Sequence, residues 1–121
     1  MKDNLIHIRA EFIIKDRKLN EFKKLVRKMC KVVEASETGT LSYRFYFNRD
    51  KTKCIVHEIF ADSEAVIAHN DSPASQIMLP KIFNVSEVVK SEVYGNPSKK
   101  LQKESTSFSQ ETYNLFAGFS R

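Results

Sequence analysis

The sequence has little glycine, proline or cysteine and no long apolar run. Its 121 residues include three Gly, three Pro and two Cys. So little Gly and Pro excludes collagen-like chains and Pro/Gly-rich disordered chains. No apolar stretch approaches the roughly 18 residues that a membrane-spanning helix needs, so no membrane partner is expected. Cys30 and Cys54 can form neither a disulfide framework nor a zinc site. Together these absences predict a reduced, cytoplasmic protein.

The composition that remains is that of one globular domain with a basic surface. Apolar residues make up 41% of the chain and charged residues 29%, and the net charge is +5. The basic side chains concentrate in residues 15–31, between the apolar positions of an expected helix. Aromatic side chains that stack on bases would have to share that basic face, but Phe22 belongs to the apolar face. We therefore expect a solvated helix face and no nucleic-acid partner.

Hydrophobic periodicity predicts the order of strands and helices. Apolar residues alternate with polar ones, or fill nearly every position, in four segments that we expect to be strands: 6–14, 41–47, 53–61 and 85–94. A spacing of three and four predicts an amphipathic helix of roughly 17 residues from Leu19. Two helical pieces, 64–69 and 75–83, are separated by Pro73. The order predicts an α+β fold of the ferredoxin-like βαββαβ type, an antiparallel sheet with helices on one face.

The third expected strand indicates how the domain assembles. Residues 53–61 are apolar on both faces of the strand, which is typical of a strand that is buried on both sides. Helices can cover only one face in a domain this small. We therefore expect a homodimer in which the open sheet faces pack together, that is, a dimeric α+β barrel.

The C-terminal part of the chain is expected to be separate from the domain of residues 1–95. Residues 96–107 read as a polar linker. The apolar side chains that follow are too many for a free tail: Phe108, Tyr113, Leu115, Phe116 and Phe119. We expect this segment to dock on the domain or its dimer mate. A capping box at Ser107 and Gln110 favours a short helix, and a strand at a sheet edge is the second alternative.

Two segments of the sequence are similar to a known family. The first is Glu37-Thr38-Gly39-Thr40-Leu41-Ser42-Tyr43. The second runs from His57-Glu58-Ile59-Phe60-Ala61-Asp62 through Ala68-His69 to Ser72-Pro73. Over residues 5–95 the chain resembles the antibiotic biosynthesis monooxygenase family of dimeric α+β barrels. The resemblance implies oxidation of a small aromatic or quinol-like molecule by O₂ without a cofactor. Haem-degrading members depend on a Trp that this chain lacks, so no haem is expected.

The candidate site residues follow from that resemblance and from side-chain chemistry. His69 and Tyr43 are the expected catalytic residues, because one titrates near neutrality and the other can hold a substrate oxygen. Glu58, Phe60 and Met78 are the expected substrate-binding residues. Four of the five have a structural alternative: His69 as a helix cap, Tyr43 and Met78 as core residues, and Glu58 as the ion-pair partner of Arg9 or Arg44. The three histidines are too scattered in the sequence to predict a metal site.

Three functions remain open at this point. The first is a cofactor-independent monooxygenase acting on a small molecule in an apolar pocket. The second is a non-catalytic ligand-binding or stress-related dimer on the same fold. The third is a nucleic-acid or protein-interaction module that uses the basic helix. An apolar pocket in which His69, Tyr43 and Glu58 converge would favour the first function.

Overall fold

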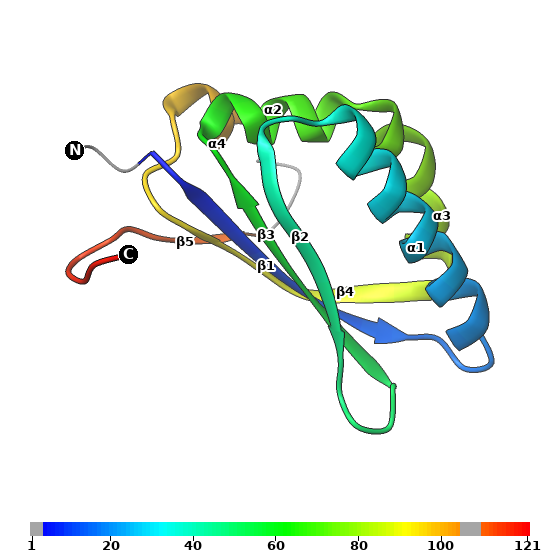
Figure 1. The fold of residues 1–121 in the computed structure, drawn as a ribbon. Coiled ribbons are helices and arrows are strands. Elements are labelled where there is room, and N and C mark those ends of the chain that lie inside the picture. Colours follow the sequence, from blue (N-terminus) through cyan, green and yellow to red (C-terminus); the bar gives the residue numbers. More distant parts are fainter. Residues whose placement is uncertain (1–3, 105–109) are drawn as a thin grey trace.

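The computed structural model describes residues 4–104 and 110–121. It shows a curved sheet that is covered on one face by helices (Figure 1). The first five elements are β1 (Ile6–Ile14), α1 (Leu19–Ser36), β2 (Thr40–Phe47), β3 (Lys53–Phe60) and α2 (Ser63–Asp71). They are followed by a π-helical turn η1 (Ala74–Met78), α3 (Leu79–Val85), β4 (Ser86–Tyr94), α4 (Lys99–Glu104) and β5 (Glu111–Tyr113). The first four strands and the helices between them confirm the predicted ferredoxin-like order.

The strands lie in the order β2-β3-β1-β4-β5. The pairs β2–β3, β3–β1 and β1–β4 are antiparallel, whereas β5 runs parallel to β4. The sheet is therefore mixed, because a fifth strand extends the antiparallel sheet that the sequence predicted. The helices gather on one face, and the opposite face carries none of the described helices (Figure 1).

Two apolar clusters hold the helices to the sheet. The larger one packs the buried stripe of α1, which is Phe22, Val26, Met29 and Val33, against β1, β3 and α3. Within it the rings of Phe12 and Phe22 meet edge to face at 6.1 Å. The smaller cluster joins α2 and α4 to the sheet through Ile6, Phe60, Val66, Ile67, Val93 and Leu101.

The start of α2 and the turn before β2 position residues from distant segments. Asp62 caps α2, because its carboxylate accepts a hydrogen bond from the backbone N–H of Ala65 at 2.8 Å. The turn between α1 and β2 lies directly against this helix. A Cβ atom on Gly39 would approach the Cβ of Ala65 to 2.6 Å, so only glycine permits this contact. The C-terminal end of α1 is thereby brought next to α2.

The segment after β4 differs from the prediction in two respects. The expected linker contains α4, whose Leu101 is buried. The expected helix over 108–119 is wrong for its described part, in which Glu111–Tyr113 form β5 on the edge of β4. The ring of Tyr113 stacks on that of Tyr94 at 5.3 Å. This cross-strand contact stabilises pairing with the edge of β4 relative to a helix. Phe108 and the Ser107 end of the capping box lie outside the described residues.

Beyond β5 the chain runs past the edge of the sheet (Figure 1). Leu115, Phe116 and Phe119 are exposed there, Phe116 almost completely at 99%. The described part of the tail is thus docked through β5 and through the side chains of Gln110 and Asn114 on either side of it, and its last apolar side chains face outward. The division into a domain of residues 1–95 and a tail stays a prediction.

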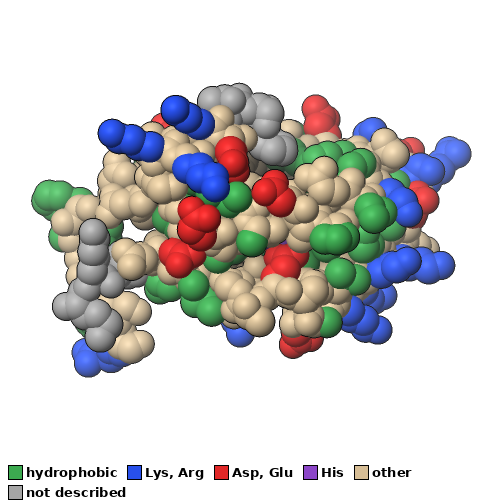
Figure 2. Space-filling model, turned by 90° about the horizontal axis from the view of Figure 1, so that it is seen from above, with side chains coloured by type: hydrophobic (Ala, Val, Ile, Leu, Met, Phe, Trp, Pro, Cys, Tyr) green, Lys and Arg blue, Asp and Glu red, His purple; other side chains and the backbone are tan. Residues whose placement is uncertain are grey.

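The basic residues of α1 are distributed as expected for a solvated helix face. Lys24, Arg27, Lys28 and Lys31 are exposed, while the apolar stripe faces the sheet. The view onto the helices shows basic side chains toward its two ends and acidic side chains gathered between them (Figure 2). Within the described ranges no helix is long and apolar enough to span a bilayer.

Candidate active site

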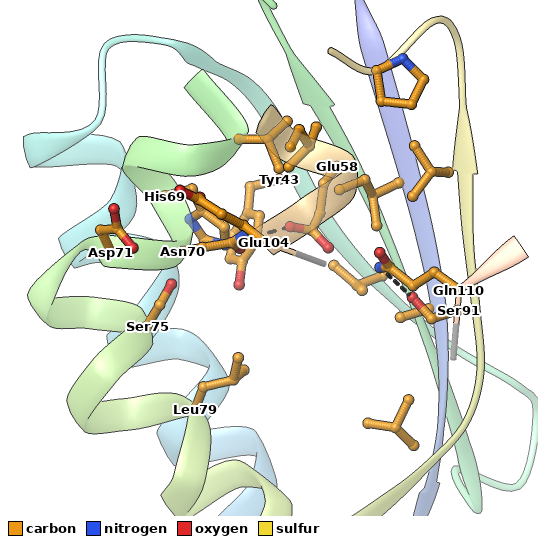
Figure 3. A pocket seen from close by; sticks show the side chains of 18 of the residues that line it. Tyr43, Glu58, His69, Asn70, Asp71, Ser75, Leu79, Ser91, Glu104 and Gln110 are labelled. Carbon is orange, nitrogen blue, oxygen red and sulfur yellow. Dashed lines mark hydrogen bonds and ion pairs between the residues drawn. The ribbon is translucent and has the colours of Figure 1, made fainter. Parts of the chain in front are cut away.

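A cavity of about 990 Å³ lies between the inner face of the sheet and the helices α2, η1 and α3. Its floor is apolar and comes from neighbouring strands, with Ile8 and Ala10 from β1 and Val56 from β3. Leu79 and Phe83 continue the apolar wall on the helix side. His69, Tyr43 and Glu58 all line one part of it (Figure 3). Three residues predicted from the sequence therefore do converge on one apolar pocket.

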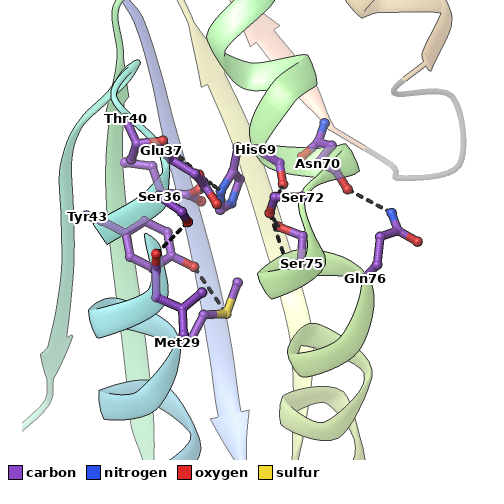
Figure 4. A network of polar contacts seen from close by, with 12 residues as sticks. Met29, Ser36, Glu37, Thr40, Tyr43, His69, Asn70, Ser72, Ser75 and Gln76 are labelled. Carbon is purple, nitrogen blue, oxygen red and sulfur yellow. Dashed lines mark hydrogen bonds and ion pairs between the residues drawn. The ribbon is translucent and has the colours of Figure 1, made fainter. Parts of the chain in front are cut away.

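His69 lies in the last turn of α2 and is buried between two carboxylates. Its Nδ1 lies 2.6 Å from Oε1 of Glu37, the residue that ends α1 (Figure 4). At this separation the ring N–H donates a short, charge-assisted hydrogen bond to the carboxylate. The hydroxyl of Thr40 donates a second hydrogen bond to the same oxygen at 2.9 Å. Glu37 thereby fixes the orientation of the imidazole, with Nε2 directed toward Glu58.

Glu58 occupies the other side of the imidazole. Its Oε1 lies 3.4 Å from Nε2 of His69, and the side chains of both residues are almost fully enclosed. Burial raises the pKa of Glu58 from 4.5 to about 8, and the negative charge of Glu37 adds to the effect. Glu58 therefore carries a proton at neutral pH and lies directly beside Nε2. A carboxyl group with a pKa near neutrality can act both as an acid and as a base.

Two aromatic rings pack against the imidazole of His69. The rings of Tyr43 and Phe60 each lie 5.4 Å from that of His69, measured between centroids. The hydroxyl of Tyr43 donates to the sulfur of Met29 at 3.5 Å (Figure 4). Burial raises the pKa of Tyr43 well above its ordinary value, with smaller effects from the nearby acids. Tyr43 is therefore a neutral phenol that packs on His69, and it is not available as a base at neutral pH.

The other predicted substrate-binding residues lie outside the cavity wall. Phe60 is fully buried beneath His69, and Met78 is buried in the larger core cluster. Glu58 does not pair with Arg9, which instead contacts Glu92 at 3.2 Å and Glu11 at 3.4 Å. The side chain of Arg9 lies on the face of the sheet opposite to that of Glu58, because Ile8, the neighbour of Arg9, is the residue that pairs with Glu58.

The sequence analysis missed Glu37 as a site residue. The one sequence feature that could have identified Glu37 is its position two residues before Gly39, in the motif that resembles the family. One oxygen of Glu37, Oε2, is buried without a hydrogen-bond partner among the described residues. An acid kept in such a position needs the imidazole proton on its other oxygen. Glu37 and Glu58 contact different ring nitrogens, so they cannot converge with His69 on one metal ion.

The mouth of the cavity is polar on both sides. Asn70, Asp71 and Ser75 project from the helices, and Ser91 and Gln110 face them from β4 and the start of β5 (Figure 3). The amide of Gln110 donates to the hydroxyl of Ser91 at 2.8 Å. The cavity thus combines an apolar centre, a buried acid–base group and a rim that can hydrogen-bond.

The raised pKa of Glu58 predicts how stability depends on pH. Between about 4.5 and about 8 the folded protein keeps a proton that the unfolded chain releases, so unfolding becomes easier as pH rises. We expect the free energy of unfolding in urea to fall over this range. Glu58→Gln, which cannot ionise and matches the protonated side chain in shape, should abolish most of that fall.

The matched control is Glu87→Gln, which alters an exposed carboxyl on β4. This variant should follow the pH dependence of the unaltered protein. If Glu58→Gln loses stability with pH as steeply as the unaltered protein does, Glu58 is not the protonated group.

Similar proteins of known structure share this fold. MupZ from Pseudomonas fluorescens superposes with a TM-score of 0.86 at 23% identity, covering 98% of this chain and 95% of MupZ. A proposed antibiotic biosynthesis monooxygenase from Nitrosomonas europaea gives a TM-score of 0.70 at 15% identity, covering 79% and 93% of the two chains. A further one from Bacteroides thetaiotaomicron gives 0.66 at 20% identity, covering 74% and 85%.

Sequence comparison identifies the family, although none of the curated proteins matches the chain. Residues 5–79, well over half of the chain, match the model of the antibiotic biosynthesis monooxygenase family. The matched region contains β1 to η1 and therefore Glu37, Glu58 and His69. It is also the region that carries both motifs noted in the sequence. The chain accordingly belongs to the antibiotic biosynthesis monooxygenase family.

Proposed function

We propose that this protein is a cofactor-independent monooxygenase that oxidises a small phenolic or quinol-like molecule in the cavity. The observation that carries the proposal is the buried imidazole of His69 between Glu37 at 2.6 Å and Glu58 at 3.4 Å. Such an arrangement can accept a proton at the cavity wall and return it later. Family membership supports oxygen chemistry as the reaction that uses it.

The first step of the proposed reaction is removal of the phenolic proton. Glu58 passes its own proton to Nε2 of His69, and the imidazolium is stabilised by the Glu37 carboxylate. The freed carboxylate of Glu58 then takes the proton of the substrate hydroxyl. The resulting phenolate is electron-rich enough to react with O₂, and the apolar floor keeps water away from it.

The later steps consume one O₂ and release one water. The phenolate transfers an electron to O₂, and the two radicals join to form a C–O bond at the para carbon. The para C–H proton then moves to the outer peroxide oxygen as the O–O bond breaks, which leaves a quinone and hydroxide. The hydroxide receives the proton that Glu58 took, and the imidazolium of His69 returns its proton to Glu58, so the phenol and O₂ give the quinone and water. Glu58 thus acts first as a base and then as an acid.

A homodimer formed through the open sheet face belongs to the same proposal. Ile13 and Tyr46 are exposed on that face at 37% and 49%, and Ile55 and Ile59 lie beside them half-buried. Apolar side chains on a sheet face without helices favour a second copy as the cover. Free cysteines at positions 30 and 54 support a reduced, cytoplasmic location.

Oxygen uptake tests the proposed reaction, with 1-naphthol and related phenols as substrates. The unaltered protein should convert 1-naphthol and O₂ into 1,4-naphthoquinone and water, placing one atom of ¹⁸O₂ in the quinone. Glu58→Gln should lower kcat by about 100-fold or more, because the proton transfer is lost while the shape of the cavity is kept.

Glu87→Gln is the matched control, because Glu87 is an exposed carboxyl on β4 that does not line the cavity. It should leave kcat nearly unchanged. If the phenols bind but no variant, including the unaltered protein, takes up O₂, the monooxygenase proposal is wrong. The second function, a ligand-binding dimer, would then account for the cavity.

The dimer is tested by light scattering after size exclusion. The measured mass should be about twice the 14.0 kDa of the chain. Tyr46→Lys should give a monomer, because it places a charge within the proposed interface. Ile77→Lys changes a side chain that is 60% exposed on the helical side and should leave the dimer intact. A monomeric unaltered protein at micromolar concentration would contradict the proposal.

A further inference from the structure

We propose that β5 and the adjoining edge of β4 form a specificity wall for an elongated, uncharged substrate with hydroxyl or carbonyl groups at one end. The other end, which reacts, lies at Glu58. This inference rests on the proposed function in one respect, namely that the cavity is the substrate site. The wall consists of Ser91, Gln110, Thr112 and Asn114, all of which line the cavity.

The register of the sheet places the two ends of this substrate on one line. Glu58 pairs with Ile8, Ile8 pairs with Val93, and Val93 pairs with Thr112. Paired residues point to the same face, and all four line the cavity. Three strand spacings of about 4.8 Å put Thr112 about 14 Å from Glu58. Between the acid and the hydroxyl lie only the apolar side chains of Ile8 and Val93.

The wall presents hydrogen-bonding groups at Thr112 of β5 and at the residues that flank this strand. Gln110, Thr112 and Asn114 all line the cavity, at alternate positions of an extended segment. The amide of Gln110 is held by Ser91 at 2.8 Å, and that of Asn114 by the carbonyl of Gly95 at 2.9 Å. Their carbonyl oxygens remain as acceptors. Within the described ranges, no group hydrogen-bonds the Thr112 hydroxyl.

The charges around the cavity specify which end group the wall accepts. The carboxylates of Asp71 and Glu104 line it, whereas none of its described lining residues is Lys or Arg. A carboxylate, phosphate or sulfate would enter without a counter-charge, which is unfavourable. Amide oxygens and a hydroxyl instead complement the hydroxyl, amide and ketone groups of a neutral molecule. The residues of the wall itself carry no carboxylate, so an ammonium group finds no counter-charge among them either. The wall therefore selects a polar but uncharged end.

The specificity wall lies outside the part of the chain that defines the family. The family match ends at residue 79, and β4 and β5 follow it. The match with MupZ covers 98% of this chain and so includes nearly all of the segment after β4. The matches with the proteins from N. europaea and B. thetaiotaomicron cover 79% and 74%. The wall thus lies in a part of the chain whose sequence could change substrate choice without altering the family-matched region that holds Glu37, Glu58 and His69.

Binding of four probes tests the specificity wall. Each probe is a 1-naphthol that carries an extended chain spanning about 14 Å, which ends in a dihydroxypropyl amide, a methyl group, a carboxylate or a trimethylammonium group. Fluorescence titration without O₂ gives the affinities independently of turnover. The dihydroxypropyl amide should bind tightest and the carboxylate weakest. Thr112→Val should weaken the amide probe about fivefold and leave the methyl probe nearly unchanged.

Two further variants separate the wall from the rest of the molecule. Glu111→Gln alters the neighbouring residue of β5, on its other face, and should change no affinity. Thr112→Lys supplies the missing counter-charge and should make the carboxylate probe bind better than the methyl probe. A gain in affinity for the carboxylate probe cannot arise from a damaged fold. Thr112→Lys therefore tests the inference even if Thr112→Val is unstable.

The outcomes distinguish this inference from the proposed reaction. The inference is overturned if the carboxylate or the ammonium probe binds tightest, or if Thr112→Val affects the amide and methyl probes equally. If the predicted order of affinities holds but no probe is oxidised, the wall stands and the monooxygenase proposal fails. If the probes are oxidised but bind without discrimination, the monooxygenase proposal stands and the specificity wall fails.

Discussion

The site depends on one buried contact, the imidazole of His69 held between the carboxylates of Glu37 and Glu58. Two acids in an apolar setting are costly unless a proton or a cation lies between them. The imidazole provides that link, and it ties together the end of α1, the centre of β3 and the end of α2. The close contact of Gly39 with Ala65 makes this meeting of elements sterically possible. Burial and the charge of Glu37 together keep a proton on Glu58 at neutral pH.

The cavity extends this contact into a site with two different ends. Near His69 the imidazole lies against aromatic rings and the carboxyl group of Glu58, whereas near β5 the wall offers hydroxyl and amide groups. The apolar side chains of Ile8 and Val93 separate the two ends. The region that matches the family model holds the end with His69, and the strands after it supply the other end. Reaction type and substrate choice would then be carried by different parts of one short chain.

The sequence predicted the parts of this molecule that depend on local patterns. Alternation and helical spacing predicted β1 to β4 and α1, and the motif around Glu58 and His69 identified two members of the buried contact. Glu37 was missed because its partner lies 32 residues away and a polar turn gives no sign that an acid is buried. β5 was expected first as a helix, since the capping signal is local while the stacking of Tyr113 on Tyr94 is not. Phe60 and Met78 have the apolar character of pocket residues, but the packing of α2 and α1 buries them behind the wall.

The central claim is that Glu58 is protonated beside His69 at neutral pH, and infrared spectroscopy measures this directly. A protonated carboxyl group absorbs separately from carboxylates, and Glu58→Gln identifies which band belongs to Glu58. The account predicts a protonated carboxyl band at neutral pH that disappears with a midpoint near pH 8 and is absent from the variant. A spectrum without any protonated carboxyl group at neutral pH, or a band that persists in Glu58→Gln, would contradict it.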